Sequence, residues 1–258
     1  MKASPSIILL LLGSTATAHC TYEHQTDRDP GLTAAAGEPT FELAATVPQG
    51  GQHGVSIGTA VELRLSAAPD PDTVVATNVR VFAGLVETPG QLTVDLLDRW
   101  IRFAPLSPLR PNLRHQVYVH RSLRGLNGAG LGETVIFNFT TGDSDTTQPE
   151  TAPPGAAGAR VQADLFAKRC ATCHRQPDPP ARVDLSSVQS SVASLRAQPA
   201  SFGGKLRVAP HKHAQSYLML KLLGEGGFVG FRMPATGSKL SRVQLRMVAS
   251  WIDAGALP

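Results

Sequence analysis

Aromatic and charged residues are scarce in this 258-residue sequence, at 5% and 17% of the chain. Apolar residues nevertheless make up 42%, which is enough for packed cores, so the chain as a whole is not disordered. Paired catalytic carboxylates, a G-x-S-x-G motif and a phosphate-binding glycine loop do not stand out. The basic residues are not interleaved with aromatic ones, which argues against nucleic acid as a partner.

Long hydrophobic runs are also lacking. The run Ile7–Leu12 is far shorter than the roughly 20 residues that a transmembrane helix needs. Met1-Lys2 supplies a basic start and Ala16-Thr17-Ala18 a small-residue cleavage pattern, so we expect a signal peptide at residues 1–19. The sequence therefore predicts an exported protein of the periplasm or cell envelope.

Only three cysteines are present, Cys20, Cys170 and Cys173, and an odd number in an exported chain needs an explanation. Cys20 lies just past the signal region, where a bacterial lipoprotein carries its lipidated first residue. The preceding residues Thr17–His19 depart from the usual lipobox. Two alternatives stay open: a lipid anchor at Cys20, or a soluble product with a free thiol. Residues 20–40 have no periodicity and are interpreted as a tether.

Residues 41–142 show hydrophobic residues at every second position, with clusters of Gly, Pro, Asp and Asn between the runs. This pattern predicts about seven short strands and an antiparallel β-sandwich. The predicted strands are Phe41–Leu43, Val61–Leu65, Val79–Val81, Gln91–Val94, Trp100–Phe103, Val117–Val119 and Val135–Phe139.

The same stretch resembles the bacterial Ig-like domains of extracellular and surface proteins. The resemblance runs through Thr46–Ser66, Trp100–Pro105, Leu109–Asn112, Val117–Val119 and Phe139–Gly142, in the order of that family's elements. It implies a spacer or adhesion role and no chemistry.

Residues 143–159 are rich in Ser, Thr, Pro, Gly and Ala and are predicted to form a linker. After it, both the periodicity and the charge change. Residues 160–258 hold 14 basic and 5 acidic residues, against 10 and 15 in residues 1–159. We expect helices ending at the cysteines (Val161–Phe166), at Ser216–Leu223, and after a capping box at Ser241–Gln244, with Gly255 closing the last one. The sequence therefore predicts an all-α domain over 160–258.

The most specific chemical motif of the sequence is Cys170-Ala171-Thr172-Cys173-His174. C-x-x-C-H is the pattern of covalent c-type haem attachment, in which both thiols form thioethers and the histidine is the proximal iron ligand. The pattern predicts one covalently attached haem c held by Cys170 and Cys173, with His174 bound to the iron.

A second axial ligand is expected if the haem transfers electrons. Met219 and Met247 fall within predicted helices, where methionine usually fills the core. Met233 lies in a loop before Pro234, which favours an extended conformation and makes it the preferred distal ligand. His211 and His213 remain as alternatives.

The C-terminal part also resembles the cytochrome c superfamily. The resemblance rests on the C-x-x-C-H segment, the Arg232-Met233-Pro234 loop, Val208–Leu218 and the closing Leu245–Ala256, in the family's order. It implies a monohaem domain with Cys170 and Cys173 as attachment points and His174 and Met233 as iron ligands. It also implies that the first and last helices cross, with Phe166 against Trp251. His211 follows Pro210, at a position where many relatives have glycine.

These observations predict a cell-envelope monohaem c-type cytochrome that transfers single electrons and is not an enzyme. Basic residues of the haem half are expected to steer an acidic redox partner: Lys168, Arg169, Arg175, Lys205 and Lys212. Three alternatives stay open. The haem belongs to an enzyme subunit or gas sensor with an exchangeable distal ligand. The Ig-like half is a surface binding module in which haem is secondary. Cys170, Cys173, His211 and His213 bind structural zinc instead.

Overall fold

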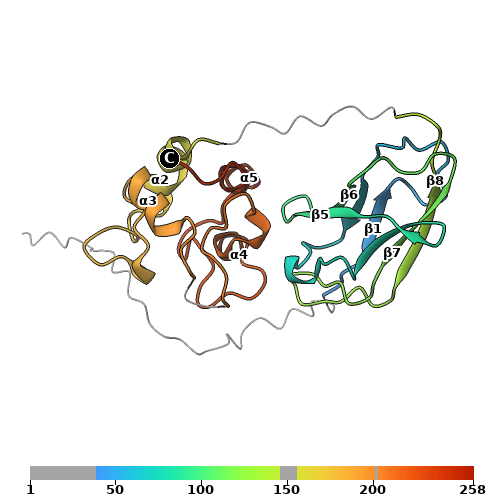
Figure 1. The fold of residues 1–258 in the computed structure, drawn as a ribbon. Helices are drawn as coiled ribbons and strands as arrows, with labels where there is room; N and C mark the ends of the chain where they lie inside the picture. The colour runs from blue at the N-terminus through green and yellow to red at the C-terminus, as the bar shows by residue number, and fades with distance from the viewer. Residues whose placement is uncertain (1–38, 146–155, 201–202) are drawn as a thin grey trace, which may run out of the picture.

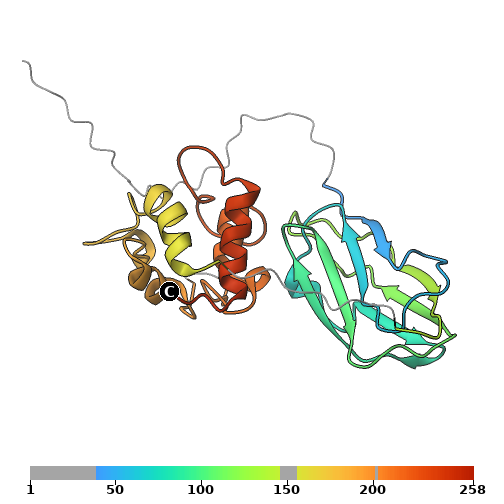
Figure 2. The same cartoon turned by 90° about the horizontal axis from the view of Figure 1, so that it is seen from above.

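The computed structural model describes residues 39–145, 156–200 and 203–258. The predicted signal peptide, most of the tether with Cys20, and the middle of the predicted linker lie outside these residues. The described chain forms two parts, a β-sandwich of residues 39–145 and a C-terminal region of residues 156–258 (Figure 1, Figure 2). Among the described residues no helix is long and apolar enough to cross a membrane.

The β-sandwich consists of two four-stranded antiparallel sheets, which confirms the predicted architecture. One sheet has the order β1-β2-β6-β5 and the other β4-β3-β7-β8. All seven predicted strands lie at or overlap observed ones, and only the two-residue β4 was not predicted. The strands are β1 Leu43–Val47, β2 Val61–Leu65, β3 Val79–Ala83, β4 Val86–Glu87, β5 Gly90–Asp95, β6 Trp100–Pro105, β7 Arg114–Val119 and β8 Val135–Thr140.

The alternating pattern of the sequence explains the sandwich core. In β2, Val61, Leu63 and Leu65 are buried while Glu62 and Arg64 lie on the outer face and pair with each other. The strands β3 and β7 alternate in the same way, since successive side chains of a strand point to opposite faces. One face of each sheet is therefore apolar and packs against the other.

The prediction of an all-α, cytochrome c-like domain over 160–258 is wrong. The C-terminal region has only short helices, joined by long irregular segments and two isolated β-bridges, Arg196↔Val208 and Pro199↔Leu206. Its helical segments are α1 Gly158–Val161, η2 Gln162–Phe166, α2 Ala167–Arg169, η3 Pro180–Arg182, α3 Val188–Leu195, η4 His213–Gln215, α4 Tyr217–Leu223 and α5 Arg242–Asp253. The cause is local: prolines and glycines recur between the helical segments and stop helix propagation, as at Pro177, Pro179, Pro180 and Gly224.

The three predicted helices are nevertheless present within this region. The segments α1, η2 and α2 follow one another directly and end just before Cys170, with η2 being a π-helical turn. The helix α4 matches the predicted Ser216–Leu223. The helix α5 begins with the predicted capping box, in which Ser241 accepts from the Gln244 N–H and Gln244 accepts from the Ser241 N–H. Phe166 packs edge-on against Trp251 at a centroid distance of 5.8 Å, as the resemblance implied.

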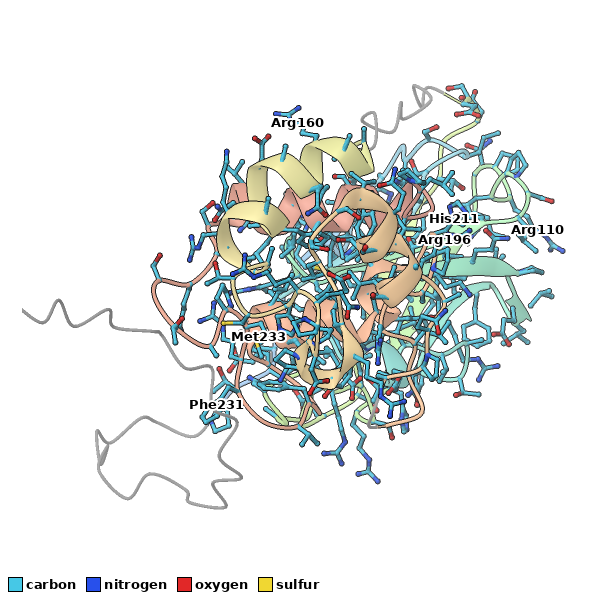
Figure 3. All side chains as sticks on the ribbon, turned by 90° about the vertical axis from the view of Figure 1, so that its left-hand side faces the viewer. Arg110, Arg160, Arg196, His211, Phe231 and Met233 are labelled. Carbon is cyan, nitrogen blue, oxygen red and sulfur yellow. The ribbon has the colours of Figure 1, made fainter. Side chains whose placement is uncertain are left out.

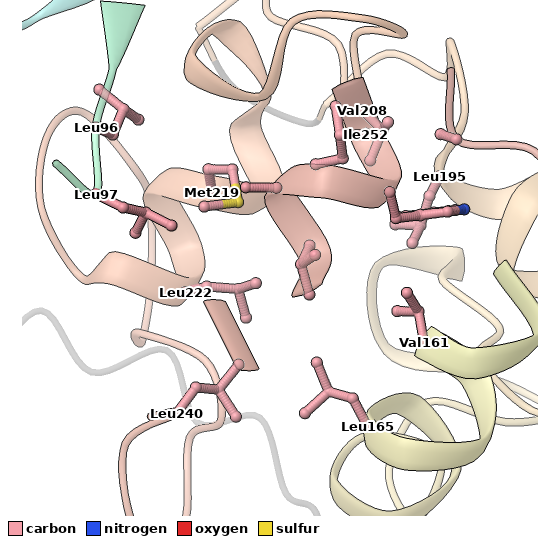
Figure 4. Close-up of a cluster of buried hydrophobic side chains, with 14 of the residues drawn as sticks. Leu96, Leu97, Val161, Leu165, Leu195, Val208, Met219, Leu222, Leu240 and Ile252 are labelled. Atoms are coloured by element: carbon pink, nitrogen blue, oxygen red, sulfur yellow. The ribbon is translucent and has the colours of Figure 1, made fainter. Parts of the chain in front are cut away.

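A hairpin end of the β-sandwich packs into the core of the C-terminal region. Leu96 and Leu97, which follow β5, are buried in the same cluster as Met219 and Leu222 of α4 (Figure 4). Beside them, Arg246 of α5 donates to Asp95 and Asp98, each over a shortest distance of 2.6 Å. Arg242 also pairs with Asp98, and Lys205 pairs with Asp72 over 2.7 Å. The two parts are therefore joined by a packed interface as well as by the linker.

Candidate functional site

The C-x-x-C-H segment forms a hydrogen-bonded turn at the end of the first helical stretch. The N–H groups of Cys170 and Ala171 donate to the carbonyl of Phe166 over 3.0 and 2.8 Å. The N–H groups of Cys173 and His174 then donate to the carbonyl of Cys170 over 3.2 and 2.9 Å. Both cysteines and the histidine are thus fixed by one continuous set of backbone bonds, anchored to the helix that carries Phe166.

The two thiols of the motif are in different states. Cys170 is free and partly buried, and burial raises the pKa of its thiol to about 11, so it is protonated at neutral pH. Cys173 is disulfide-bonded. A thioether at Cys173 therefore requires that this disulfide be reduced first, whereas Cys170 already carries a free thiol.

His174 is held with one ring nitrogen committed to the protein. Its Nδ1 lies 3.2 Å from the carbonyl oxygen of Val183, and since a carbonyl only accepts, Nδ1 carries the proton. Burial lowers the pKa of His174, the carbonyls of Val183 and Pro180 oppose this, and the charge of Lys221 adds to the lowering. The imidazole is therefore neutral with its lone pair at Nε2, the form in which histidine binds iron or zinc.

Met233 lies in an irregular segment, as predicted, and is bonded to α4. Its N–H donates to the backbone carbonyl of Lys221 over 2.7 Å. Its side chain is half-buried and packs against the same apolar cluster as Cys170. The side chain of Arg232, the residue before Met233, donates to the carbonyl of Leu222 over 3.1 Å. The loop that carries Met233 is thus attached to the last turn of α4.

The other two methionines of this region serve the core. Met219 is fully buried among the side chains in Figure 4, and Met247 of α5 packs against the same cluster. Both positions agree with the expectation that methionine within a helix fills space.

The two alternative histidines are committed to the end of α5. The Nδ1 atom of His213 lies 2.8 Å from the Asp253 carboxylate, and that of His211 lies 3.0 Å from the Asp253 carbonyl. In the view of Figure 3, the labelled His211 lies well away from Met233 and Phe231. His213 is buried. The structure therefore ties Met233 to Lys221, whose charge acts on His174, and ties His211 and His213 to Asp253.

The zinc arrangement is not assembled. Within residues 39–145, 156–200 and 203–258, no three His, Cys, Asp or Glu side chains are grouped so that they could hold a metal ion. A structural zinc site needs four such ligands, whereas a haem iron takes only two from the protein.

Lys221 is the site residue that the sequence interpretation missed. Its ammonium donates to the carbonyls of Val229, over 2.8 Å, and Phe231, and lies 5.1 Å from the centre of the Phe228 ring. The available signal was its position as the single charge within the apolar helix Tyr217–Leu223. A lysine placed there must extend its charged end to a polar partner.

Comparison with known proteins identifies the β-sandwich only. A family model described as a bacterial Ig-like domain matches residues 37–141. No curated protein matches the chain.

Several solved structures are similar to the sandwich at low identity. The methionine rich copper resistance protein PcoC from Escherichia coli is 14% identical, with 40% of this chain and 99% of that chain covered and a TM-score of 0.34. The L,D-transpeptidase 1 of Mycobacterium tuberculosis is 19% identical, with 41% and 40% covered and a TM-score of 0.28. CopC from Methylosinus trichosporium OB3b is 11% identical, with 43% and 100% covered and a TM-score of 0.33. At these values the likenesses carry no functional argument. Residues 37–141 of this chain are a bacterial Ig-like domain.

Proposed function

We propose that this protein is a monohaem c-type cytochrome of the cell envelope that transfers single electrons. The observation that carries the proposal is His174, which directly follows the second thiol of C-x-x-C-H. It is held neutral, with Nδ1–H donated to Val183 and Nε2 left with its lone pair. A metal-bound histidine typically donates its other N–H to a backbone carbonyl or carboxylate in this way. The resemblance to the cytochrome c superfamily supports the same ligands, although the region is not the all-α domain that it implied.

Each residue of the site has a distinct role in this proposal. Cys170 and Cys173 would hold the haem by thioethers, and His174 would be an iron ligand. Met233 would be the second protein ligand, because a thioether suits an electron-transfer haem and the loop is tied to α4. When bound, the haem supplies one-electron cycling of its iron. The chain itself would hold the haem at the two cysteines and orient His174 through the Val183 carbonyl.

The proposed partner is a redox protein with an acidic docking face. Of the five basic residues considered, Lys205 and Arg169 are engaged within the molecule, with Asp72 and with the Ser238 carbonyl. Arg175 and Lys212 are exposed and Lys168 makes only a loose pair with Asp164, over 3.5 Å. These three remain for steering the encounter. The proposal includes export, with a lipid anchor as the form the protein takes when Cys20 is acylated.

The test is the absorption spectrum of the reduced protein, purified from a host that attaches haem to exported chains, with and without carbon monoxide. Electron transfer through a six-coordinate haem predicts a spectrum that carbon monoxide does not change. Met233→Ala is expected to keep the haem and to bind carbon monoxide rapidly, while the core variant Met219→Leu is expected to behave as wild type. Rapid uptake by the wild-type protein would contradict the proposal and favour the enzyme or sensor alternative.

A further inference from the structure

Lys221 connects three parts of the candidate site at once. Its backbone carbonyl accepts the N–H of Met233, and its ammonium donates to the carbonyls of Val229 and Phe231. The ammonium also lies over the Phe228 ring. Side chain and backbone of Lys221 together therefore hold the loop at Val229, at Phe231 and at Met233 itself.

These bonds satisfy the carbonyls of Val229 and Phe231, which accept from no other donor among the described residues. The segment Gly227–Gly237 forms no helix or strand, so its carbonyls lack the ladder partners that regular structure provides. A charged donor to such carbonyls is worth more than a neutral one. The Tyr217 hydroxyl, one turn before Lys221 on α4, accepts the N–H of Val229 over 3.0 Å and supports the same segment.

The ammonium is itself partly withdrawn from solvent. Burial lowers the pKa of Lys221, yet Phe228, Val229 and Phe231 surround it with a ring face and two carbonyl oxygens. No carboxylate of the described residues pairs with the ammonium, so its positive charge is not neutralised locally.

We propose that Lys221 is the positioning residue for the distal ligand: it holds the Met233 loop in place and leaves one uncompensated positive charge beside that loop. This inference rests on the proposed function and adds to it a residue that is neither an attachment point nor an iron ligand. Two consequences follow. Loss of the ammonium releases Met233, and loss of its charge lowers the reduction potential, because a nearby positive charge favours the reduced iron.

The experiment compares Lys221→Leu, Lys221→Arg and the control Lys239→Leu with wild type, all as the full chain. Lys239 is an exposed lysine of the same region, so its replacement removes the same charge without these bonds. Leucine fits the apolar helix α4, so Lys221→Leu is expected to fold. It should retain covalent haem, bind carbon monoxide at least about tenfold faster in the ferrous state and have a lower potential. Lys221→Arg should restore slow binding because it keeps the charge and the donors.

A second measurement needs no haem. Hydrogen exchange of the protein without haem should show faster exchange of the Val229 and Met233 amides in Lys221→Leu than in Lys239→Leu. Unchanged carbon monoxide binding and unchanged exchange in Lys221→Leu, with haem retained in every variant, would overturn the role of Lys221 and leave the proposed function standing. Absence of covalent haem from the wild-type protein would overturn both.

Discussion

The β-sandwich and the C-terminal region satisfy their backbones by different means. In the sandwich, the two sheets pair strand with strand, and the ladders use most backbone groups without help from side chains. In the C-terminal region, long polar side chains reach loop carbonyls instead. Gln162 donates to Leu185, Arg169 to Ser238, Arg207 to Ala181 and Ser194, and Lys221 to Val229 and Phe231.

The two parts should therefore respond differently to single substitutions. A ladder is distributed over many equivalent bonds, so a single surface substitution in the sandwich removes little. A loop held by one arginine or lysine depends more strongly on that side chain, because few other bonds hold its carbonyls. The part of the molecule that carries the C-x-x-C-H segment is therefore the part that single side chains control.

Trp251→Ala should have the largest effect. Trp251 is 2% exposed, packs against Phe166 and donates its Nε1–H to Leu257 over 2.8 Å. We expect a loss of about 3–5 kcal/mol, confined to the C-terminal region, while the sandwich amides keep their protection from hydrogen exchange. Val243→Ala on the exposed side of α5 is the control and should change stability by less than about 0.5 kcal/mol. Equal loss of protection in both parts would show that they unfold as one unit.

Arg246→Met tests the interface between the two parts. It removes one of the two arginine partners of Asp98 and leaves Asp95, whose side chain is only 10% exposed, without its cation. We expect a loss of about 2 kcal/mol by thermal or denaturant unfolding, below the value for a fully buried pair because Arg246 is partly exposed. Arg80→Met, which breaks the exposed pair with Glu87, should cost clearly less than Arg246→Met. An Arg246 effect no larger than the Arg80 effect would contradict a packed interface.

Arg207→Met sharpens the contrast between loops and ladders. Arg207 donates to the carbonyls of Ala181 and Ser194, each over 2.8 Å, and burial lowers the pKa of its guanidinium. We expect a loss of about 1–2 kcal/mol and faster exchange around residues 181–195. Arg114→Met on the exposed face of β7 should be within about 0.5 kcal/mol of wild type. If the two substitutions cost the same, side-chain tethers are not what distinguishes the C-terminal region.

The pH dependence of the interface should be the smallest effect. Burial of Asp95 raises the pKa of its carboxyl. Hydrogen bonds from Arg246 and from the Asp98 N–H lower this pKa by more than burial raises it, so the net pKa is below the usual 3.8. The unfolded chain then binds the proton first. The contribution of Asp95 is fully present above pH 3.8 and is lost as the pH falls through the lower folded value. Unfolding measured against pH should show this loss, below about 1 kcal/mol, in wild type but not in Arg246→Met.

The sandwich could be predicted from sequence because apolar residues alternate along each strand and identify its buried face, as Val61, Leu63 and Leu65 do. In the C-terminal region, the capping box at Ser241 and the apolar stretch of α4 were equally local, and both helices are present. The helix α3 and the bridges that pair Arg196 with Val208 were not predicted. They depend on contacts between distant segments, which leave no periodicity.

The candidate site shows the same division. The segment from Cys170 to His174 is identifiable from spacing alone, and Met233 from its proline. The contact of Lys221 with Val229 and Phe231 joins a helix to a loop that has no pattern of its own. The contact of Asp95 with Arg246 joins residues that are 151 positions apart in the sequence, one in each part. Neither contact follows from sequence spacing, because each depends on how whole segments pack.

The most direct test of the central claim is denaturing electrophoresis of the exported full chain under reducing conditions, followed by detection of haem in the gel. Only covalently attached haem survives this treatment. We expect the wild-type chain to give a haem band at its own position in the gel. This band should be weakened or lost in Cys170→Ser and Cys173→Ser and retained in Met233→Ala and Lys221→Leu. A wild-type chain without a haem band, or a band that persists when both cysteines are replaced, would contradict the central claim.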